Sequence, residues 1–452
     1  MPRRRQCSGD ARRAVEPTNA VAGDIYQNLL HGHIPTEADR MDARSLTQAV
    51  AKDQNLMVDS LCSMLKIKAV GPENEGPGEA RRGKFIISLA RKLGFESIDV
   101  YESPDKRVQT GKRPNIVIRV KGTTNRNLWV VTHMDTVPEG DPKAWKYPPF
   151  MGKVVGGKIF GRGSEDNGQE LIASLFGLRA LLKSGIIPEF NIGLVFVSDE
   201  EHGNAHGIDF LIAKKIFKKG DLAVVPDHGE PDGSAISVVE KSIAWVDVEV
   251  IGKQTHGSTP ERGVNAFEVG ARFMITAVDR LRERFTITDE LFEPPISTFA
   301  PTKCDSNGPN INTIPGRQTF SLDFRVLPEY KLDDVLAVLE KTAAEYEKST
   351  GAKINIGLSQ RADAAPRTPA DSEVVVRLAK AIRAVRGVEA NPIGIGGGTC
   401  AAPFRRIGIE AAVWSTIPGV AHDANEYALV KDLVADAQVY ALLFGGKNIE
   451  RA

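Results

Sequence analysis

Short apolar runs rich in β-branched residues recur along the first half of the chain, separated by stretches with apolar residues at helical spacing. The apolar runs fall at 115–120, 128–135, 191–200 and 221–227, and the helical spacing falls at 42–66, 79–93, 170–185 and 207–217. Buried strands that alternate with helices are typical of a largely parallel sheet covered on both faces. The pattern therefore predicts an α/β fold with a mostly parallel sheet covered by helices.

Near residue 241 the pattern changes. Segments 244–252 and 318–327 alternate apolar and polar residues, as strands with one wet face do. Helical spacing at 264–283 and 332–349 predicts a smaller α+β domain inserted into the α/β domain. The main domain is expected to resume with a helix at 371–386, a strand at 410–416 and a last helix at 430–444. The predicted divisions are a disordered tail at 1–40, the main domain at 41–241 and 359–452, and the inserted domain at 242–358.

Composition narrows the classes of partner. The 452 residues include 58 basic and 58 acidic side chains, so the net charge is zero and gives no support for binding to nucleic acid or a membrane surface. No apolar run approaches the roughly 20 residues that span a bilayer. The basic start lacks the apolar stretch of a secretory signal. The four cysteines are scattered without a CxxC pair, which favours a reducing cytoplasm.

Three of the apolar runs end in polar groups that suit a metal ion. In open α/β sheets, ligands bind beyond the carboxyl ends of the strands. One such ending would mean little, because capping residues also collect there, but three in one sheet predict a convergent site. Imidazole and carboxylate groups without thiolate suit zinc first, with cobalt or manganese as alternatives. The candidate ligands are His133, Asp166, Glu201, Asp227 and His422.

The number of carboxylates indicates two metal ions. Several anions in one cleft repel each other unless cations are present, and two divalent ions bridged by one carboxylate would resolve this repulsion. A water nucleophile also needs a base within hydrogen-bond reach. Glu200, which adjoins a candidate ligand, is the candidate base, and Asp135 is expected to orient the imidazole of His133.

The order of the motifs resembles a known family. The chain contains, in sequence, THMDTVP, GRGSEDNG, SDEEHG, THGSTPERGVNA, INTIPG, DFR, GGGT and AHDANEY. This order is similar to that of the metallo-aminoacylase/carboxypeptidase family, which includes acetylornithine deacetylase, succinyl-diaminopimelate desuccinylase, glutamate carboxypeptidase and several dipeptidases. The resemblance covers about residues 42–446 and implies a catalytic main domain with an inserted dimerisation domain, or lid.

The resemblance also implies roles for the candidate residues. It pairs His133 with Asp227 at one metal ion and Glu201 with His422 at the other, with Asp166 as the bridge. The peptide bond between Asp166 and Asn167 would be cis. Glu200 would act as general base and then as general acid toward the leaving amine.

In the inserted domain, the resemblance implies contacts with the substrate and a homodimer. His256 resembles the histidine that reaches the partner subunit's active site and polarises the scissile carbonyl. Arg325 resembles the arginine that binds a substrate carboxylate. Asn312, Gly398 and Thr399 resemble further substrate contacts.

Two departures from the family pattern leave the substrate open. Cys400 stands where many relatives carry Asp or Ser, although no neighbouring histidine supports a catalytic cysteine. Asp227 stands where many deacylases use Glu, which favours a dipeptidase slightly. The expected function is therefore hydrolysis of an amide bond in a dipeptide or N-acyl amino acid. Deacylase or desuccinylase activity is a near-equal alternative, and a non-catalytic amino-acid-binding relative is a third.

Overall fold

The computed structural model describes residues 42–308 and 310–449, and it confirms the predicted α/β fold class. The predicted tail at 1–40 lies outside the described residues. An eight-stranded sheet has the order β1-β2-β6-β3-β7-β16-β8-β15, and β6, β3, β7 and β16 run parallel to one another at its centre. Its strands are β1 (Ile98–Pro104), β2 (Lys112–Val120), β3 (Asn127–His133), β6 (Asn191–Val197), β7 (Leu222–Gly229), β8 (Ala235–Glu240), β15 (Asn391–Ile395) and β16 (Glu410–Ser415).

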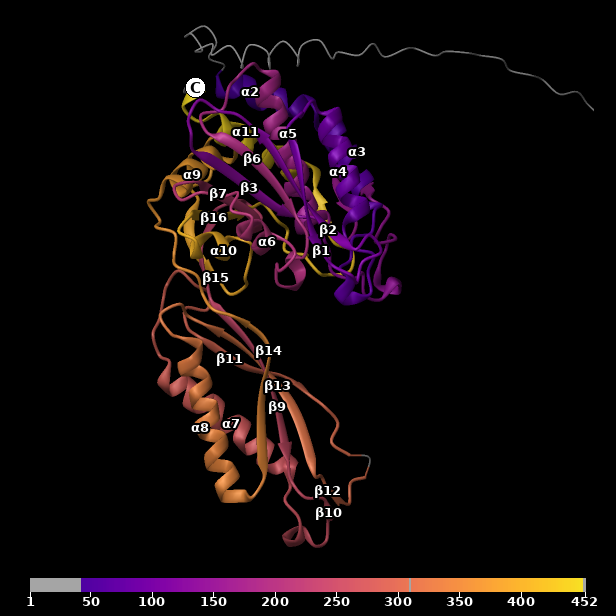
Figure 1. The fold of residues 1–452 in the computed structure, drawn as a ribbon, viewed down its shortest axis with the longest axis vertical. Helices are drawn as coiled ribbons and strands as arrows, with labels where there is room; N and C mark the ends of the chain where they lie inside the picture. The colour runs from indigo at the N-terminus through magenta and orange to yellow at the C-terminus, as the bar shows by residue number, and fades with distance from the viewer. Residues whose placement is uncertain (1–41, 309, 450–452) are drawn as a thin grey trace, which may run out of the picture.

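Helices cover both faces of this sheet (Figure 1). The larger core lies on the face covered by α2 (Ala43–Lys52), α3 (Gln54–Leu65), α4 (Ala80–Lys92), α5 (Gln169–Lys183), α9 (Glu373–Arg386) and α11 (Val430–Gly445). A smaller core lies on the other face, under α6 (Ile208–Ala213) and α10 (Ala401–Arg406). A three-stranded sheet of β4 (Lys153–Val155), β5 (Lys158–Phe160) and β17 (Tyr427–Leu429) flanks the domain. Among the described residues, none of the helices is both long and apolar enough to cross a membrane.

One predicted helix is divided in two. The single amphipathic helix expected at 42–66 is wrong in this respect, because α2 ends and α3 begins at Asp53. The backbone N–H of Asp53 bonds to the carbonyl of Val50, three residues earlier, which closes the first helix. The carboxylate of Asp53 makes no cap bond to α3 and pairs instead with Arg179 of α5, at 3.2 Å. The apolar spacing alone does not reveal this break.

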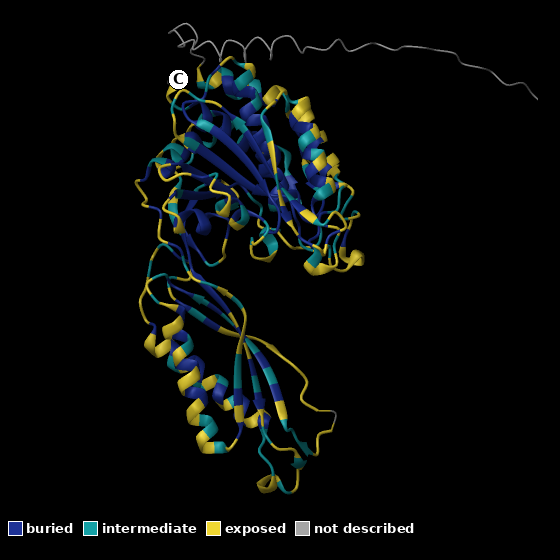
Figure 2. Ribbon diagram, viewed as in Figure 1, coloured by how far each residue is buried: buried dark blue, intermediate teal, exposed yellow. Residues whose placement is uncertain are grey.

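The residues from 242 to 362, called the lid here, form a second sheet that extends away from the main domain (Figure 1). Its order is β11-β13-β9-β14, all antiparallel, and α7 and α8 pack on one face (Figure 2). Burial alternates along β9 and β13, as expected for strands with one wet face. The domain boundaries stay a prediction. The elements are β9 (Ser242–Ile251), α7 (Ala266–Arg284), β11 (Thr298–Cys304), β13 (Arg317–Val326), α8 (Leu332–Thr350), β14 (Lys353–Ala362) and the short pair β10 (Thr255–His256) and β12 (Thr313–Ile314).

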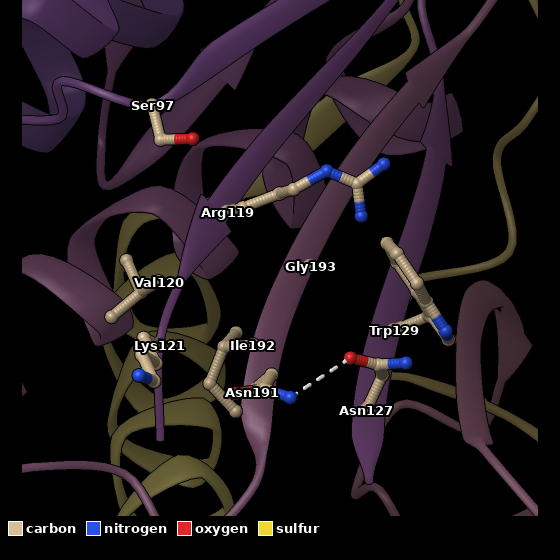
Figure 3. A pocket seen from close by; sticks show the side chains of 9 residues that line it. All are labelled: Ser97, Arg119, Val120, Lys121, Asn127, Trp129, Asn191, Ile192 and Gly193. Carbon is tan, nitrogen blue, oxygen red and sulfur yellow. Dashed lines mark hydrogen bonds between the residues drawn. The ribbon is translucent and has the colours of Figure 1, made fainter. Parts of the chain in front are cut away.

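In a pocket lined by Arg119, Trp129 and Gly193 on the main sheet, the arginine lies over the tryptophan. Figure 3 shows Arg119 of β2 reaching across Gly193 toward Trp129, with its guanidinium carbon 5.1 Å from the ring centre. The indole is fixed from the other side, because its N–H donates to Asp221 at 2.9 Å and its ring packs edge-on against Phe217. The Cε3–Cζ3 edge of the ring lies against Gly193, where a Cβ atom would approach Cε3 to 2.1 Å.

We expect Gly193→Ala to destabilise the protein by about 1–3 kcal/mol, because the added methyl group overpacks a ring that cannot move aside. Urea unfolding of the variant and the parent protein measures this loss. Gly357→Ala, in strand β14, is the matched control, since the nearest atom to its new Cβ lies 3.8 Å away. Equal stability of the two alanine variants would contradict the account of Trp129.

Candidate metal centre

The proposed ligands come from loops at one edge of the main sheet. β3 pairs in parallel with both β6 and β7, so the carboxyl ends of these strands lie side by side. His133 ends β3, Glu200 and Glu201 follow β6, and Asp227 lies near the carboxyl end of β7. Two further loops bring Asp166, ahead of α5, and His422, ahead of β17, to the same edge.

The five proposed ligands converge around Asp166. One oxygen of this carboxylate lies 2.7 Å from Nε2 of His133, and the other lies 3.1 Å from Nε2 of His422. Nε2 of His133 is also 3.4 Å from Asp227, and Nε2 of His422 is 3.2 Å from Glu201. The carboxylate thus lies between two His–carboxylate pairs. The Asp166–Asn167 peptide bond is cis, as the resemblance implied.

The donor atoms lie close enough to hold metal ions. His133, Asp166 and Glu201 each offer an atom within 4.8 Å of the others, and so do His133, Glu200 and Asp227. These are nitrogen and oxygen donors, which suit zinc, cobalt or manganese. Glu200 therefore lies within reach of a metal ion, as well as next to the proposed ligand Glu201.

The charges in the cleft oppose one another in a way that cations would relieve. Burial raises the pKa of Glu200 well above its ordinary value, and the nearby Asp227 raises it further. Burial, followed by the charge of Asp166, raises the pKa of Glu201 to about 7. Hydrogen bonds to Asp166 and Glu201 raise the pKa of His422 to about 10. Divalent cations would offset this concentration of negative charge, and the nitrogen and oxygen donors present fit a site that holds them.

Asp135 holds the glutamate loop as well as the histidine. Its carboxylate accepts hydrogen bonds from the backbone N–H groups of Glu200 and Glu201, at 3.2 and 3.1 Å. Its backbone carbonyl lies 3.1 Å from Nδ1 of His133, while its carboxylate lies 3.7 Å from the same nitrogen. The imidazole is therefore oriented mainly by the carbonyl, and the carboxylate joins the ends of β3 and β6.

Two proposed substrate residues lie far from this cluster within one chain. His256 and Asn312 are exposed beside the β10–β12 pair, at the end of the lid that points away from the main domain (Figure 1). The N–H of Gly257 donates to the carbonyl of Asn312 at 2.7 Å, and Nδ1 of His256 lies 2.7 Å from the hydroxyl of Ser258. The structure brings these two residues together but does not bring them to the ligands.

The remaining proposed contacts lie where the lid meets the main domain. Arg325 donates to both oxygens of Asp323 and to the carbonyl of Gly396, at 2.7–2.9 Å. Gly396 begins the loop that contains Gly398 and Thr399, and the Thr399 hydroxyl donates to the buried Glu240 at 2.7 Å. These residues are therefore connected to one another across the junction of the two sheets.

Cys400 is buried behind the same loop. Its thiol lies 3.2 Å from the side-chain oxygen of Asn204, in the loop that also carries Glu200. Burial, followed by the charges of Glu200 and Asp227, raises the pKa of this thiol well above its ordinary value. A thiol that resists ionisation is a poor nucleophile, which weighs against a catalytic cysteine.

Glu426, to which the sequence pattern assigns no role, connects the loops of the proposed ligands Asp166 and His422. One oxygen accepts from the backbone N–H groups of Glu165 and Asp166, at 2.9 and 3.2 Å, and the other accepts from Gly163 and from the Arg162 side chain. Arg162 in turn donates to the carbonyl of His422 at 3.0 Å. The glutamate lies inside the motif AHDANEY, but nothing in that string indicates burial.

Two buried arginines also have no role in the sequence pattern, because nothing in the sequence indicates that they are buried. Arg82, in α4, donates to the carbonyls of Ile67 and Met134, and within the described residues it forms no ion pair. Met134 lies between His133 and Asp135, so this cation supports the turn at the end of β3. Arg113, in β2, pairs with Glu79 and Asp199, next to Glu200. Both arginines place positive charge behind the carboxylates of the cleft. Arg82 lies within the helix predicted at 79–93, and Arg113 lies just before the strand predicted at 115–120.

Comparison with known proteins gives one family. The profile of peptidase family M20/M25/M40 matches residues 129–445. An uncharacterized metallohydrolase of Methanocaldococcus jannaschii is 36% identical over 83% of this chain and 96% of the relative. The succinyl-diaminopimelate desuccinylase of Paracoccus denitrificans is 24% identical over 79% of this chain and 91% of the enzyme.

Solved structures show the same fold. The aminopeptidase PepT of Bacillus cereus superposes with a TM-score of 0.69 at 18% identity, over 87% of this chain and 98% of that structure. Human carnosine dipeptidase 1 superposes with a TM-score of 0.66 at 16% identity, over 89% and 98%. At these identities the likeness concerns the fold alone.

We expect zinc to stabilise the folded protein, because ions that bind only the folded state raise stability by mass action, by about 4 kcal/mol at about a thousand times Kd. Thermal unfolding of the chelator-treated protein with and without added zinc measures this gain. Asp166→Asn should lose most of it, since this residue lies between the two His–carboxylate pairs. Asp247→Asn, on the lid, is the control and should keep the full gain. An unchanged gain in Asp166→Asn would exclude the proposed bridge.

Proposed function

The chain belongs to peptidase family M20/M25/M40 and is a metal-dependent hydrolase, and from this premise we propose that it cleaves an amide bond in a small carboxylate-bearing substrate with two metal ions. The observation that carries the proposal is the position of Asp166, which directs one oxygen to His133 and the other to His422. A carboxylate shared in this way is the natural bridge between two cations. Zinc is the proposed metal, with cobalt or manganese as alternatives.

The reaction divides between the ions and the side chains around them. Two divalent cations would polarise the scissile carbonyl and lower the pKa of water nearby. Glu200 would take the proton from the attacking water and deliver it to the leaving amine. Asp135 would keep Glu200 and Glu201 in place through their backbone N–H groups. The retained base and ligand set argue against the non-catalytic alternative.

Arg325 is the proposed site for the substrate carboxylate. A guanidinium has five N–H donors, and its three bonds to Asp323 and Gly396 leave two for a ligand. Asp323 would hold the guanidinium of Arg325 in position and leave some of its N–H donors free. Gly398 and Thr399, in the adjoining loop, would line the same part of the cleft.

The substrate would be a dipeptide or an N-acyl amino acid. The carnosine dipeptidase fold and the desuccinylase relative support the two alternatives about equally. Asp227 favours the dipeptide slightly. We place the enzyme in the cytoplasm, in keeping with its scattered free cysteines.

The position of His256 supports a homodimer. This residue and Asn312 are exposed at the far end of the lid, where they serve no metal ligand of their own chain. In a dimer, the partner subunit's His256 and Asn312 would complete the cleft and stabilise the charge on the carbonyl oxygen. Each active site would then need both subunits.

A substrate panel tests the activity. We expect the zinc-loaded protein to hydrolyse members of a set of dipeptides, N-acetyl-amino acids and N-succinyl-amino acids, including acetylornithine and succinyl-diaminopimelate. Glu200→Gln should lower kcat by at least about a hundredfold, because it removes the proton carrier, while zinc stays bound. Amine release and metal content measure the two effects. Glu230→Gln is the control, because Glu230 is an exposed carboxylate directly after β7. Turnover that survives Glu200→Gln would exclude this base.

Mixed dimers test the shared site. We expect Glu200→Gln and His256→Ala each to be nearly inactive alone, whereas an exchanged equal mixture should regain up to about a quarter of the parent activity. Half of the dimers would then be mixed, with one intact site of two. Activity is measured before and after subunit exchange, and a mixture of Glu200→Gln with Asp166→Asn is the control that should regain none. Failure of the first mixture to regain activity would contradict a site shared between subunits.

A further inference from the structure

Arg113 is a buried arginine in β2 that the proposed chemistry does not use. Its side chain has no exposed surface, yet it contacts several carboxylates. The guanidinium donates to both oxygens of Glu79, and its Nη1 donates to Asp199 at 2.8 Å and to Glu73 at 3.2 Å. A rigid planar fork of donors allows arginine to hold acceptors in fixed directions.

Asp199 links this arginine to the loop of the proposed base. One carboxylate oxygen accepts from Arg113, and the other accepts from the backbone N–H of His206 at 2.9 Å. Its carbonyl accepts from the N–H of Asn204 at 2.7 Å. Its backbone is left-handed (φ 66°), which is uncommon for residues other than glycine. Asp199 thus bonds to both Asn204 and His206 and holds the loop 199–206 together. Its left-handed backbone sets the direction of the chain at Glu200.

The loop is therefore held by two separate carboxylates. Asp135, at the end of β3, accepts from the N–H groups of Glu200 and Glu201. Asp199 receives its support from Arg113 on β2, which pairs with β6. Removal of either support leaves the other in place, so the effect of Arg113 can be separated from that of the cleft residues.

We propose that Arg113 is a positioning residue: through Asp199 it fixes the loop 199–206 and directs Glu200 and Glu201 toward the metal centre. The inference rests on the proposed function for the role of Glu200. A displacement of about 1 Å can cost about a hundredfold in rate. A network with only a structural role would change stability and leave the chemistry intact.

The test compares Arg113→Lys and Asp199→Asn with the parent protein. Lysine keeps the charge, but its three donors radiate from one nitrogen, so it cannot reproduce the flat fork that holds Glu79 and Asp199 in fixed directions. We expect kcat to fall by at least about tenfold with KM within about twofold, measured on the panel substrate that the parent cleaves fastest. We also expect the affinity for zinc, measured by calorimetry on chelator-treated protein, to fall by about tenfold or more, because Glu201 shares the loop.

Arg377→Lys is the matched control. Arg377 pairs with Glu189 at 2.8 Å and with Glu373 at 2.7 Å, on α9 and away from the loop. It should lower the melting temperature without changing kcat or zinc affinity. If Arg113→Lys behaves in the same way, the positioning role is overturned. If Arg113→Lys does not fold, Asp199→Asn decides by the same two measurements.

The two proposals fail in different ways. A parent protein that cleaves no amide in the panel would overturn the proposed function, while the zinc titrations would still test the hold of Arg113 on Glu201. An active parent with equally active, equally zinc-binding Arg113→Lys and Asp199→Asn variants would overturn the positioning role alone.

Discussion

Repulsion among the carboxylates at the carboxyl ends of β3, β6 and β7 is the constraint on which the rest of the structure depends. Such a group of anions is unfavourable in a cleft with little solvent. The buried cations Arg82, Arg113 and Arg162 offset part of this repulsion from the interior side of the cleft. From the front, divalent ions would supply the remaining positive charge. The three arginines are not among the residues proposed to react or to bind metal. They can therefore offset the negative charge of the carboxylates without blocking the cleft.

Carboxylates also hold the loops of this cleft in place by accepting backbone hydrogen bonds. Glu426 and Asp135 accept backbone N–H groups from the loops that carry Asp166, Glu200 and Glu201. A side chain that accepts two or more backbone donors holds a loop without an apolar core beneath it. Loops that are distant in sequence are connected to one another in this way.

Much of the fold, and the proximity of the proposed ligands, could be predicted, because both depend on local pattern. Apolar runs that end in His133 and Asp227 imply strands and therefore a common edge, and the motif order brings in His422. The buried partners could not be predicted in this way. Arg82 and Arg113 look like surface charges of a helix and a strand until their neighbours are known. Likewise, the motif of His256 does not state how far the lid carries it from Asp166, since that distance depends on the length and direction of a whole domain.

The strand order of the main sheet has a consequence for how the protein is made. β16 lies between β7 and β8, although the whole lid separates it from both in sequence. During synthesis the centre of the main sheet must wait for residues 410–415, whereas the lid can close on itself as soon as residue 362 has emerged. The main domain is thus the first to begin and the last to be completed. His422 is synthesised only after β16. Until then a nascent chain would expose an open sheet edge beside an incomplete set of the proposed ligands.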